Sequence, residues 1–370
     1  KVKKIFPPII NNKLRVFPPN DEIESRLKGL PELVRKYREH VGVILLIDEP
    51  YLNGVSPDEI NRVTKHLKSV FSKEGVNNLK YGAIFAGALF NKQYASFINK
   101  KMIQYSEEID DYYRGNEYLL QQVSKQKDDF MGWTESVEKF RLATYDTANN
   151  LYLGGGIPEE LDVIAFDFYL STTLFDLIHV DTLDYFHGVE PKICERFKGQ
   201  STVMIKKQLS FIHDGPVNTS QSAIDSDKLI LDDVFRCRMI ATMSLLSKEL
   251  NKLSSPPSLA LIGESSANGV FEYTSNSQIK KNQPAELVEQ RILDEVKRSY
   301  RFYIENSDFF DAGLYYFLYS NSYDRSINLQ ITGAEGAQSV LDFIYGVART
   351  PTMVPFKEWR GTYTSQKVTH

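Results

Sequence analysis

The residues best suited to chemistry in this chain are two glutamates, and each stands just after a run of apolar residues. The first is Glu49, which follows the run Val41–Ile47 and Asp48 and precedes Pro50, a residue that stops regular structure. A glutamate in this place could donate or accept a proton at the end of a buried strand. Taken alone, the Asp-Glu-Pro sequence fits a loop start equally well, with Asp48 capping the next helix.

The second glutamate is Glu264, which follows the apolar run Leu259–Ile262 and Gly263 and precedes Ser265 and Ser266. Glycine before it permits close backbone approach or an unusual dihedral angle. A glutamate here could also serve only as a helix cap or as a salt-bridge partner. Two carboxylates after two different strands, however, together suit paired acid and base chemistry.

The elements that must position these glutamates are short apolar runs, each ending in polar or acidic residues or at a turn. Continuous runs of this kind are typical of strands buried on both faces, and amphipathic segments between them predict helices. Strands that alternate with helices predict a parallel sheet, whose strand carboxyl ends share one face. The predicted strands are Val41–Ile47, Tyr81–Phe85, Val163–Phe166, Leu259–Ile262 and Gly313–Tyr319, and the clearest helices are Pro57–Ser72, Leu229–Leu253 and Ala285–Tyr303.

We therefore predict an α/β fold of the TIM type, a (β/α) barrel forming a single domain over residues 1–370. Two segments are too long for simple connections and are expected to be insertions, at about 103–150 and 171–228. Only one βα unit fits before Val41, a strand near Leu14–Phe17 and a helix from about Asp21 to Glu39. An eight-stranded barrel would then need about two more strands, from an N-terminal segment of the same precursor, unless the barrel is unusual.

The order of these strand ends resembles the large superfamily of (β/α)8 retaining glycoside hydrolases. In that superfamily an acid/base glutamate ends strand four, commonly in Asn-Glu-Pro, and a nucleophilic glutamate ends strand seven. The resemblance runs from about Val41 to Asp324 and implies that Glu49 is the acid/base and Glu264 the nucleophile. It implies a polysaccharide or glycoconjugate as the substrate and requires no cofactor or metal.

The resemblance also implies a set of substrate-binding residues around the two glutamates. Tyr169 would orient Glu264, and Asp167 and Asn321 would bind sugar hydroxyl groups. Phe317 and Tyr319 stand where the superfamily usually has a strand-eight tryptophan. The full predicted set of substrate-binding residues is Asp48, Tyr51, Asp167, Tyr169, Phe317, Tyr319 and Asn321.

Two other functions fit the same residues. The first is a non-catalytic barrel that binds glycan or protein through its insertions, because a fold of this kind hosts many functions. The second is a metal-assisted hydrolase that uses Asp48, Glu49, Asp167 and Glu264. Against a metal site, the six histidines show no ligand spacing with each other or with cysteine.

Charge and hydropathy limit the partners of the chain. The formal net charge is -4 and no basic stripe is present, so we expect no nucleic-acid partner. No apolar run reaches the ~18 residues of a membrane span, so we expect no transmembrane segment. The compartment is open from the sequence, with a secreted or periplasmic location favoured if a leader has been removed.

Two cysteines, Cys194 and Cys237, are too few for a disulfide framework. Cys237 lies in an apolar helical stretch, which favours a buried and inert thiol. A single disulfide between the two cysteines is the alternative.

Overall fold

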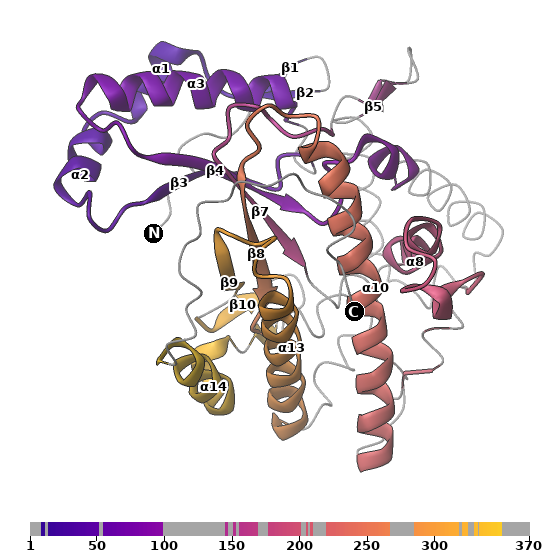
Figure 1. Ribbon diagram of the computed structural model, residues 1–370. Coiled ribbons are helices and arrows are strands. Elements are labelled where there is room, and N and C mark those ends of the chain that lie inside the picture. The colour runs from indigo at the N-terminus through magenta and orange to yellow at the C-terminus, as the bar shows by residue number, and fades with distance from the viewer. Residues whose placement is uncertain are drawn as a thin grey trace, which may run out of the picture. The chain divides into compact units, whose positions relative to one another are not determined.

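The protein is an α/β protein built on a five-stranded, all-parallel sheet (Figure 1). The strands follow one another in the order β3-β4-β7-β8-β9, which is also their order along the chain. This parallel α/β architecture was predicted from the sequence. The five strands do not show the predicted closure into a barrel. The computed structural model describes residues 9–11, 14–51, 55–98, 145–146, 151–152, 155–168, 177–200, 205, 208–209, 220–266, 285–317, 320–324, 329–331 and 333–349.

Each of the five predicted apolar runs forms one strand of this sheet. The bounds are β3 (Val43–Asp48), β4 (Lys80–Ala86), β7 (Val163–Phe168), β8 (Ser258–Glu264) and β9 (Gly313–Phe317). All six residues of β7 are buried, as expected of a strand covered on both faces. The sequence therefore identified every strand of the parallel sheet.

The N-terminal βα unit was predicted wrongly. Residues Leu14–Val16 do form a strand, β2, but it pairs antiparallel with β1 (Ile9–Asn11) in a separate two-stranded sheet. The helix expected from Asp21 to Glu39 is two helices, α1 (Asn20–Arg26) and α2 (Leu30–Lys36). The break lies at Gly29, whose φ of 83° is the left-handed conformation that ends a helix.

Of the remaining helices, the three that begin at Pro57, Gln221 and Ala285 overlap the three predicted from the hydrophobic pattern, and the others were not predicted by residue range. The remaining helices are α3 (Pro57–Lys73), α8 (Leu177–Val189), α10 (Gln221–Leu250), α13 (Ala285–Glu305) and α14 (Gln338–Arg349), with short 3-10 turns η1 (Glu195–Phe197) and η2 (Ala334–Gly336). Helix α10 begins eight residues before the predicted Leu229. Two small antiparallel hairpins are β5 (Tyr145–Asp146) with β6 (Leu151–Tyr152), and β10 (Ser322–Asp324) with β11 (Leu329–Ile331).

The two predicted insertions are covered unevenly. Of the segment 103–150, only residues 145–146 lie among the described residues, and they form strand β5. The segment 171–228 contains α8, η1 and the first turns of α10. Among the described residues, no helix combines the length and apolar character that crossing a bilayer requires.

The chain divides into two compact units. The first comprises residues 1–166 and 246–259, and the second comprises residues 167–245 and 260–370. In the first unit β4 and β7 approach closely at Gly82, where a Cβ atom would come within 2.8 Å of the carbonyl oxygen of Val163. The prediction of a single domain is not tested by this division and stays a prediction.

Helices α10 and α13 of the second unit are joined by a ladder of ion pairs. Two of the pairs link residues 66 positions apart and one links residues 64 positions apart, so the two helices run in the same direction. Parallel neighbouring helices are what successive βα units produce. The pairs are Asp227–Arg291 (3.0 Å), Lys228–Asp294 (2.9 Å) and Asp232–Arg298 (2.5 Å).

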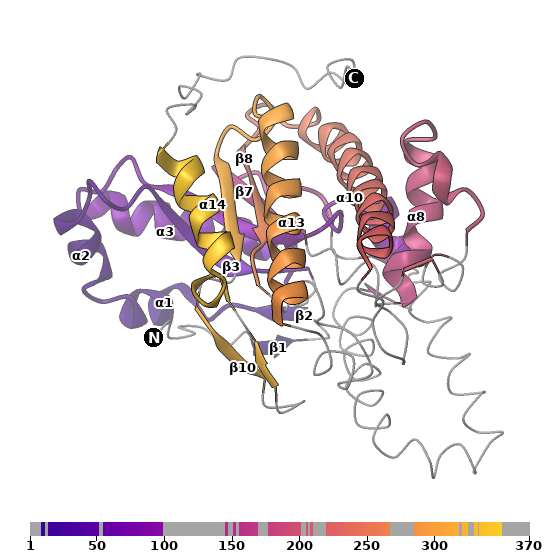
Figure 2. The ribbon, with the colours of Figure 1, turned by 90° about the horizontal axis from the view of Figure 1, so that it is seen from below.

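The far side of α13 packs against α14, which lies beside it in Figure 2. Ile292 and Val296 of α13 form one buried cluster with Val340 of α14 and with two alanines of the connecting turn, Ala334 and Ala337. Helix α13 is thus held by charged groups on one side and by apolar packing on the other.

Cys194 and Cys237 are joined by a disulfide, with their Cα atoms 4.9 Å apart. The expectation that Cys237 is a free, inert thiol was therefore wrong. Both cysteines are fully buried. The bond connects the segment before η1 to the middle of α10, which holds the long connection after β7 against that helix.

We expect reduction of this disulfide to lower the free energy of unfolding by about 3–4 kcal/mol, because it releases a loop whose ends are 43 residues apart. The measurement is urea unfolding with and without dithiothreitol. A Cys194→Ser/Cys237→Ser double variant is the control, and its curve should not respond to the reductant. An equal response of both proteins would contradict the stabilising role of the bond.

Glu295 gives a second prediction, because Arg298 binds it within α13 and both side chains are buried. Burial raises the pKa of Glu295, against the opposing charge of Arg298. The folded state then holds this proton more tightly than the unfolded state, so its contribution is present at low pH and is lost as pH rises above about 4.5. Relative to Glu295→Gln, the wild type should lose free energy of unfolding as pH rises.

Urea unfolding of both proteins between about pH 5 and about pH 8 measures this difference. Glu305→Gln is the matched control, since Glu305 lies on the same helix with 58% of its side chain exposed. Its curve should run parallel to the wild type. A constant difference between wild type and Glu295→Gln across this range would show that Glu295 does not titrate there.

Candidate functional site

Glu49 lies directly after β3 and has an unusual backbone conformation. The register between β3 and β4 shifts between Leu45 and Asp48, and Glu49 follows this irregularity with a φ of 46°. Its backbone N–H donates to the carbonyl oxygen of Ile84 at 2.8 Å. A non-glycine residue in the left-handed region costs about 1–2 kcal/mol, which the surrounding structure must offset. Such strain is often found where a side chain has to be aimed for function.

The residues around Glu49 differ sharply in burial. Asp48 is exposed, whereas Tyr51 is fully buried. The Tyr51 hydroxyl donates to the carbonyl oxygen of Gly156 at 2.6 Å, and its ring contacts that of Phe85 at 5.1 Å. Tyr51 therefore anchors the turn that carries Glu49, and its predicted contact with substrate stays a prediction.

Glu264 is the last residue of β8, and its side chain is buried. One carboxylate oxygen, Oε1, accepts the backbone N–H of Ser266 at 2.9 Å and also the Ser266 hydroxyl. The backbone N–H of Ser265 donates to Phe317 at 2.5 Å, which carries the β8–β9 ladder one residue past Glu264. The small polar residues after Glu264 thus fix both its backbone and its carboxylate.

The glycine before Glu264 is explained by the approach of α13. A Cβ atom on Gly263 would lie 3.0 Å from the Ser299 hydroxyl and 3.2 Å from the Tyr316 ring. The Tyr316 hydroxyl donates to the carbonyl oxygen of Val296 at 3.0 Å, and burial raises the pKa of Tyr316. The predicted close backbone approach at Gly263 is therefore confirmed.

Asp167 lies near the end of β7 in the second unit and is buried. The next residue, Phe168, packs against Phe235 of α10 with ring centroids 4.9 Å apart. The guanidinium of Arg238 lies over the Phe168 ring at 4.5 Å. Arg238 was not among the predicted site residues. The sequence did show an arginine inside the apolar stretch that forms the middle of α10, and the structure shows that this arginine is buried.

The other predicted binding residues differ in how much the structure says of them. Phe317 ends β9 with 42% of its surface exposed. Asn321 accepts the backbone N–H of Gly333 at 3.0 Å, and its own N–H donates to Glu335 at 2.6 Å. It thereby joins two loops of the second unit. Tyr169 and Tyr319 lie outside the described residues.

Glu49 belongs to the first unit and Glu264 to the second, and their pairing across a substrate stays a prediction. Among the described residues, no three histidine, cysteine or acidic side chains gather as a metal site would require. No protein-family model, curated protein or solved structure matches the chain.

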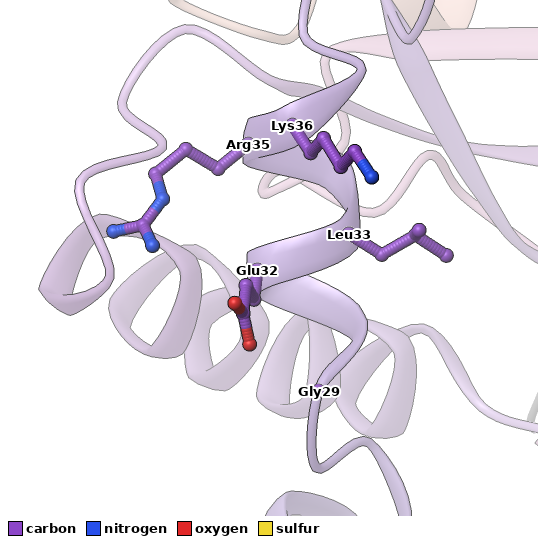
Figure 3. A pocket seen from close by; sticks show the side chains of 5 residues that line it. All are labelled: Gly29, Glu32, Leu33, Arg35 and Lys36. Carbon is purple, nitrogen blue, oxygen red and sulfur yellow. The ribbon is translucent and has the colours of Figure 1, made fainter.

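A shallow hollow of about 410 Å³ lies beside α2 and includes none of the predicted site residues (Figure 3). It is lined by Gly29, Glu32, Leu33, Arg35 and Lys36. Leu33 and Lys36 project to one side of the helix in this view, and Arg35 projects to the other.

The strain at Glu49 leads to a prediction about stability. Replacing Glu49 by glycine removes the steric cost of the left-handed conformation and adds the entropy cost of glycine, for a net gain of about 0.5 kcal/mol. Asp48→Gly is the matched control, because Asp48 lies in β3. Glycine within a strand should lower the free energy of unfolding by about 0.5–1 kcal/mol. Urea unfolding of both variants measures the two effects, and equal losses would show that the conformation at Glu49 is not strained.

Proposed function

We propose that this protein is a retaining glycoside hydrolase of the (β/α)-barrel type that acts on a polysaccharide or glycoconjugate. The observation that carries the proposal is the placement of two glutamates at the carboxyl ends of β3 and β8, two strands of one parallel sheet. Active sites of parallel α/β folds form at this end of the strands. Glu49 acts as the acid/base and Glu264 as the nucleophile.

The barrel itself is part of the proposal. The strands of the sheet keep the order of the chain, whereas a doubly wound sheet reverses its order at a switch point. Helix α10 precedes β8 in the sequence and α13 follows it. The two helices run in the same direction, as the helices of successive βα units in a barrel do. Both features support a singly wound arrangement.

The reaction would proceed in two steps with balanced proton transfers. Glu49 donates its proton to the glycosidic oxygen as the carboxylate of Glu264 attacks the anomeric carbon, which breaks the glycosidic bond and forms a glycosyl ester. Glu49 then takes a proton from water, the hydroxyl displaces Glu264, and the sugar leaves with its original configuration. The bonds from Ser266 support this role because they hold the Glu264 carboxylate in one orientation.

Other features support the setting of this chemistry. The exposed ring of Phe317, paired in register with Glu264, offers a flat apolar surface that a sugar ring can stack on. The buried disulfide supports an oxidising compartment, as in secreted and periplasmic proteins.

The test is hydrolysis of a panel of aryl glycosides and polysaccharides by the wild type and by Glu49→Gln, Glu264→Gln and Glu264→Gly. We expect Glu264→Gln to lose at least about 10³-fold in kcat, because the nucleophile is removed. Azide should restore turnover in Glu264→Gly and yield a glycosyl azide of inverted configuration. Glu49→Gln should fail with poor leaving groups and retain activity on activated ones.

Glu305→Gln serves as the control, since Glu305 lies on α13 and pairs only loosely with Arg236 at 3.7 Å. Its activity should equal that of the wild type. Turnover that survives in Glu264→Gln contradicts the proposed mechanism. Binding of glycans without turnover in the wild type would instead support the non-catalytic alternative.

A further inference from the structure

In the second unit, the ends of β8 and β9 have one face against a helix and one face turned away from it. Gly263 and Tyr316 are paired in register, and both lie against α13. Side chains alternate between the two faces along a strand. The next register pair, Glu264 and Phe317, therefore lies on the face opposite α13.

Strand β7 places Asp167 on the same face. Phe168 packs against Phe235 of α10, and α10 is joined to α13 by the ladder of ion pairs. The residue before Phe168 is Asp167, so alternation turns its side chain away from these helices. Strands β7 and β8 are neighbours, and Asp167 and Glu264 are both buried. The face opposite the helices thus carries two carboxyl groups on adjacent strands.

The charges of these strands indicate what kind of ligand this face accepts. Strands β7, β8 and β9 contain no lysine, arginine or histidine, and their charged residues are Asp167 and Glu264 alone. Two carboxylates repel an anionic ligand, and their oxygens accept hydrogen bonds from hydroxyl groups. A neutral ligand that is rich in hydroxyl groups therefore matches this face better than an acidic one.

Strand β9 adds two exposed aromatic rings beside these carboxyl groups. Tyr315 and Phe317 are two residues apart, so they share one face and are separated by about 6.6 Å along the strand. Tyr315 is 55% exposed and Phe317 is 42% exposed. The Tyr315 hydroxyl donates to the carbonyl oxygen of Ala312 at 3.2 Å, which restrains the ring. A restrained ring offers a flat apolar surface and loses little side-chain entropy on binding.

We propose that this face binds a neutral polysaccharide chain, with one sugar unit stacked on Phe317 beside Glu264 and an adjoining unit stacked on Tyr315. The inference rests on the proposed hydrolase function and deepens it, because it names neutral polysaccharides as the substrate class and Tyr315 as a specificity-determining residue. Hydroxyl groups of the chain donate to Asp167. A single sugar reaches one of the two rings, and an acidic glycan meets the two carboxylates with like charge.

The test measures the binding of oligosaccharides, from the monosaccharide to the hexasaccharide, by isothermal titration calorimetry. The neutral probes are cello-, laminari-, xylo-, manno- and chito-oligosaccharides, measured in a Glu264→Gln background that prevents turnover. We expect affinity for one neutral series to rise with the second sugar unit. Tyr315→Ala should abolish that rise, with a loss of at least about 5-fold for the longer members and no change for the monosaccharide. Oligogalacturonides, the acidic probe, should bind the wild type more weakly than that neutral series.

Two variants in the same background are the matched controls. Tyr315→Phe keeps the ring and should retain the dependence on chain length. Tyr345→Ala removes a tyrosine of α14 that is exposed to a similar extent, 50%, and should bind as the parent protein does. Equal melting temperatures of the variants and the parent protein would show that all of them are folded.

Three results would overturn the inference. They are the absence of binding to every neutral series, equal binding by Tyr315→Ala and the parent protein, and tighter binding of oligogalacturonides than of any neutral series. Failure of the hydrolase proposal would look different. Chain-length-dependent binding that requires Tyr315, without turnover by the wild type, would overturn the hydrolase chemistry and support the binding face.

Discussion

The requirement that a parallel strand be covered on both faces governs most of this structure. The central strand β7 meets the requirement completely, since all six of its residues are buried. Helices pack along the sheet because no hairpin can connect parallel strands, so each connection must cross over. The edge strands β3 and β9 meet the requirement only in part, since none of their residues is fully buried.

The sequence predicted the parallel sheet well because buried parallel strands are continuous apolar runs, and each run here became one strand. It failed at the N-terminus, where the pattern was too short to distinguish a sheet strand from a hairpin. Gly29 and Pro31 explain why the single helix predicted here is two helices. Gly29 precedes the first residue of α2, and Pro31 lies in the first turn of α2. A glycine in the left-handed conformation interrupts a helix that hydrophobic spacing alone would continue.

Long-range contacts account for what sequence patterns did not predict. Local contacts, by contrast, were within reach of the sequence. Glu264 was placed at a strand end from its neighbours, and its hydrogen-bond partner Ser266 is only two residues away. The ladder between α10 and α13 joins residues more than sixty positions apart, and such pairs leave no local pattern. The disulfide is similar, because the apolar surroundings of Cys237 fit a buried thiol and a buried bond equally well.

The two candidate glutamates are held by different physical means, and the difference suits different tasks. Glu264 is buried and its carboxylate is fixed by hydrogen bonds from Ser266, which is the fixed orientation that the proposed role as nucleophile calls for. Glu49 is only partly buried, and its backbone takes the left-handed conformation beside a register shift, which sets the direction in which its side chain leaves the strand. A group that donates a proton in one step and accepts one in the next must serve two partners in turn. An aimed but less enclosed carboxyl group meets that demand better than a fully enclosed one.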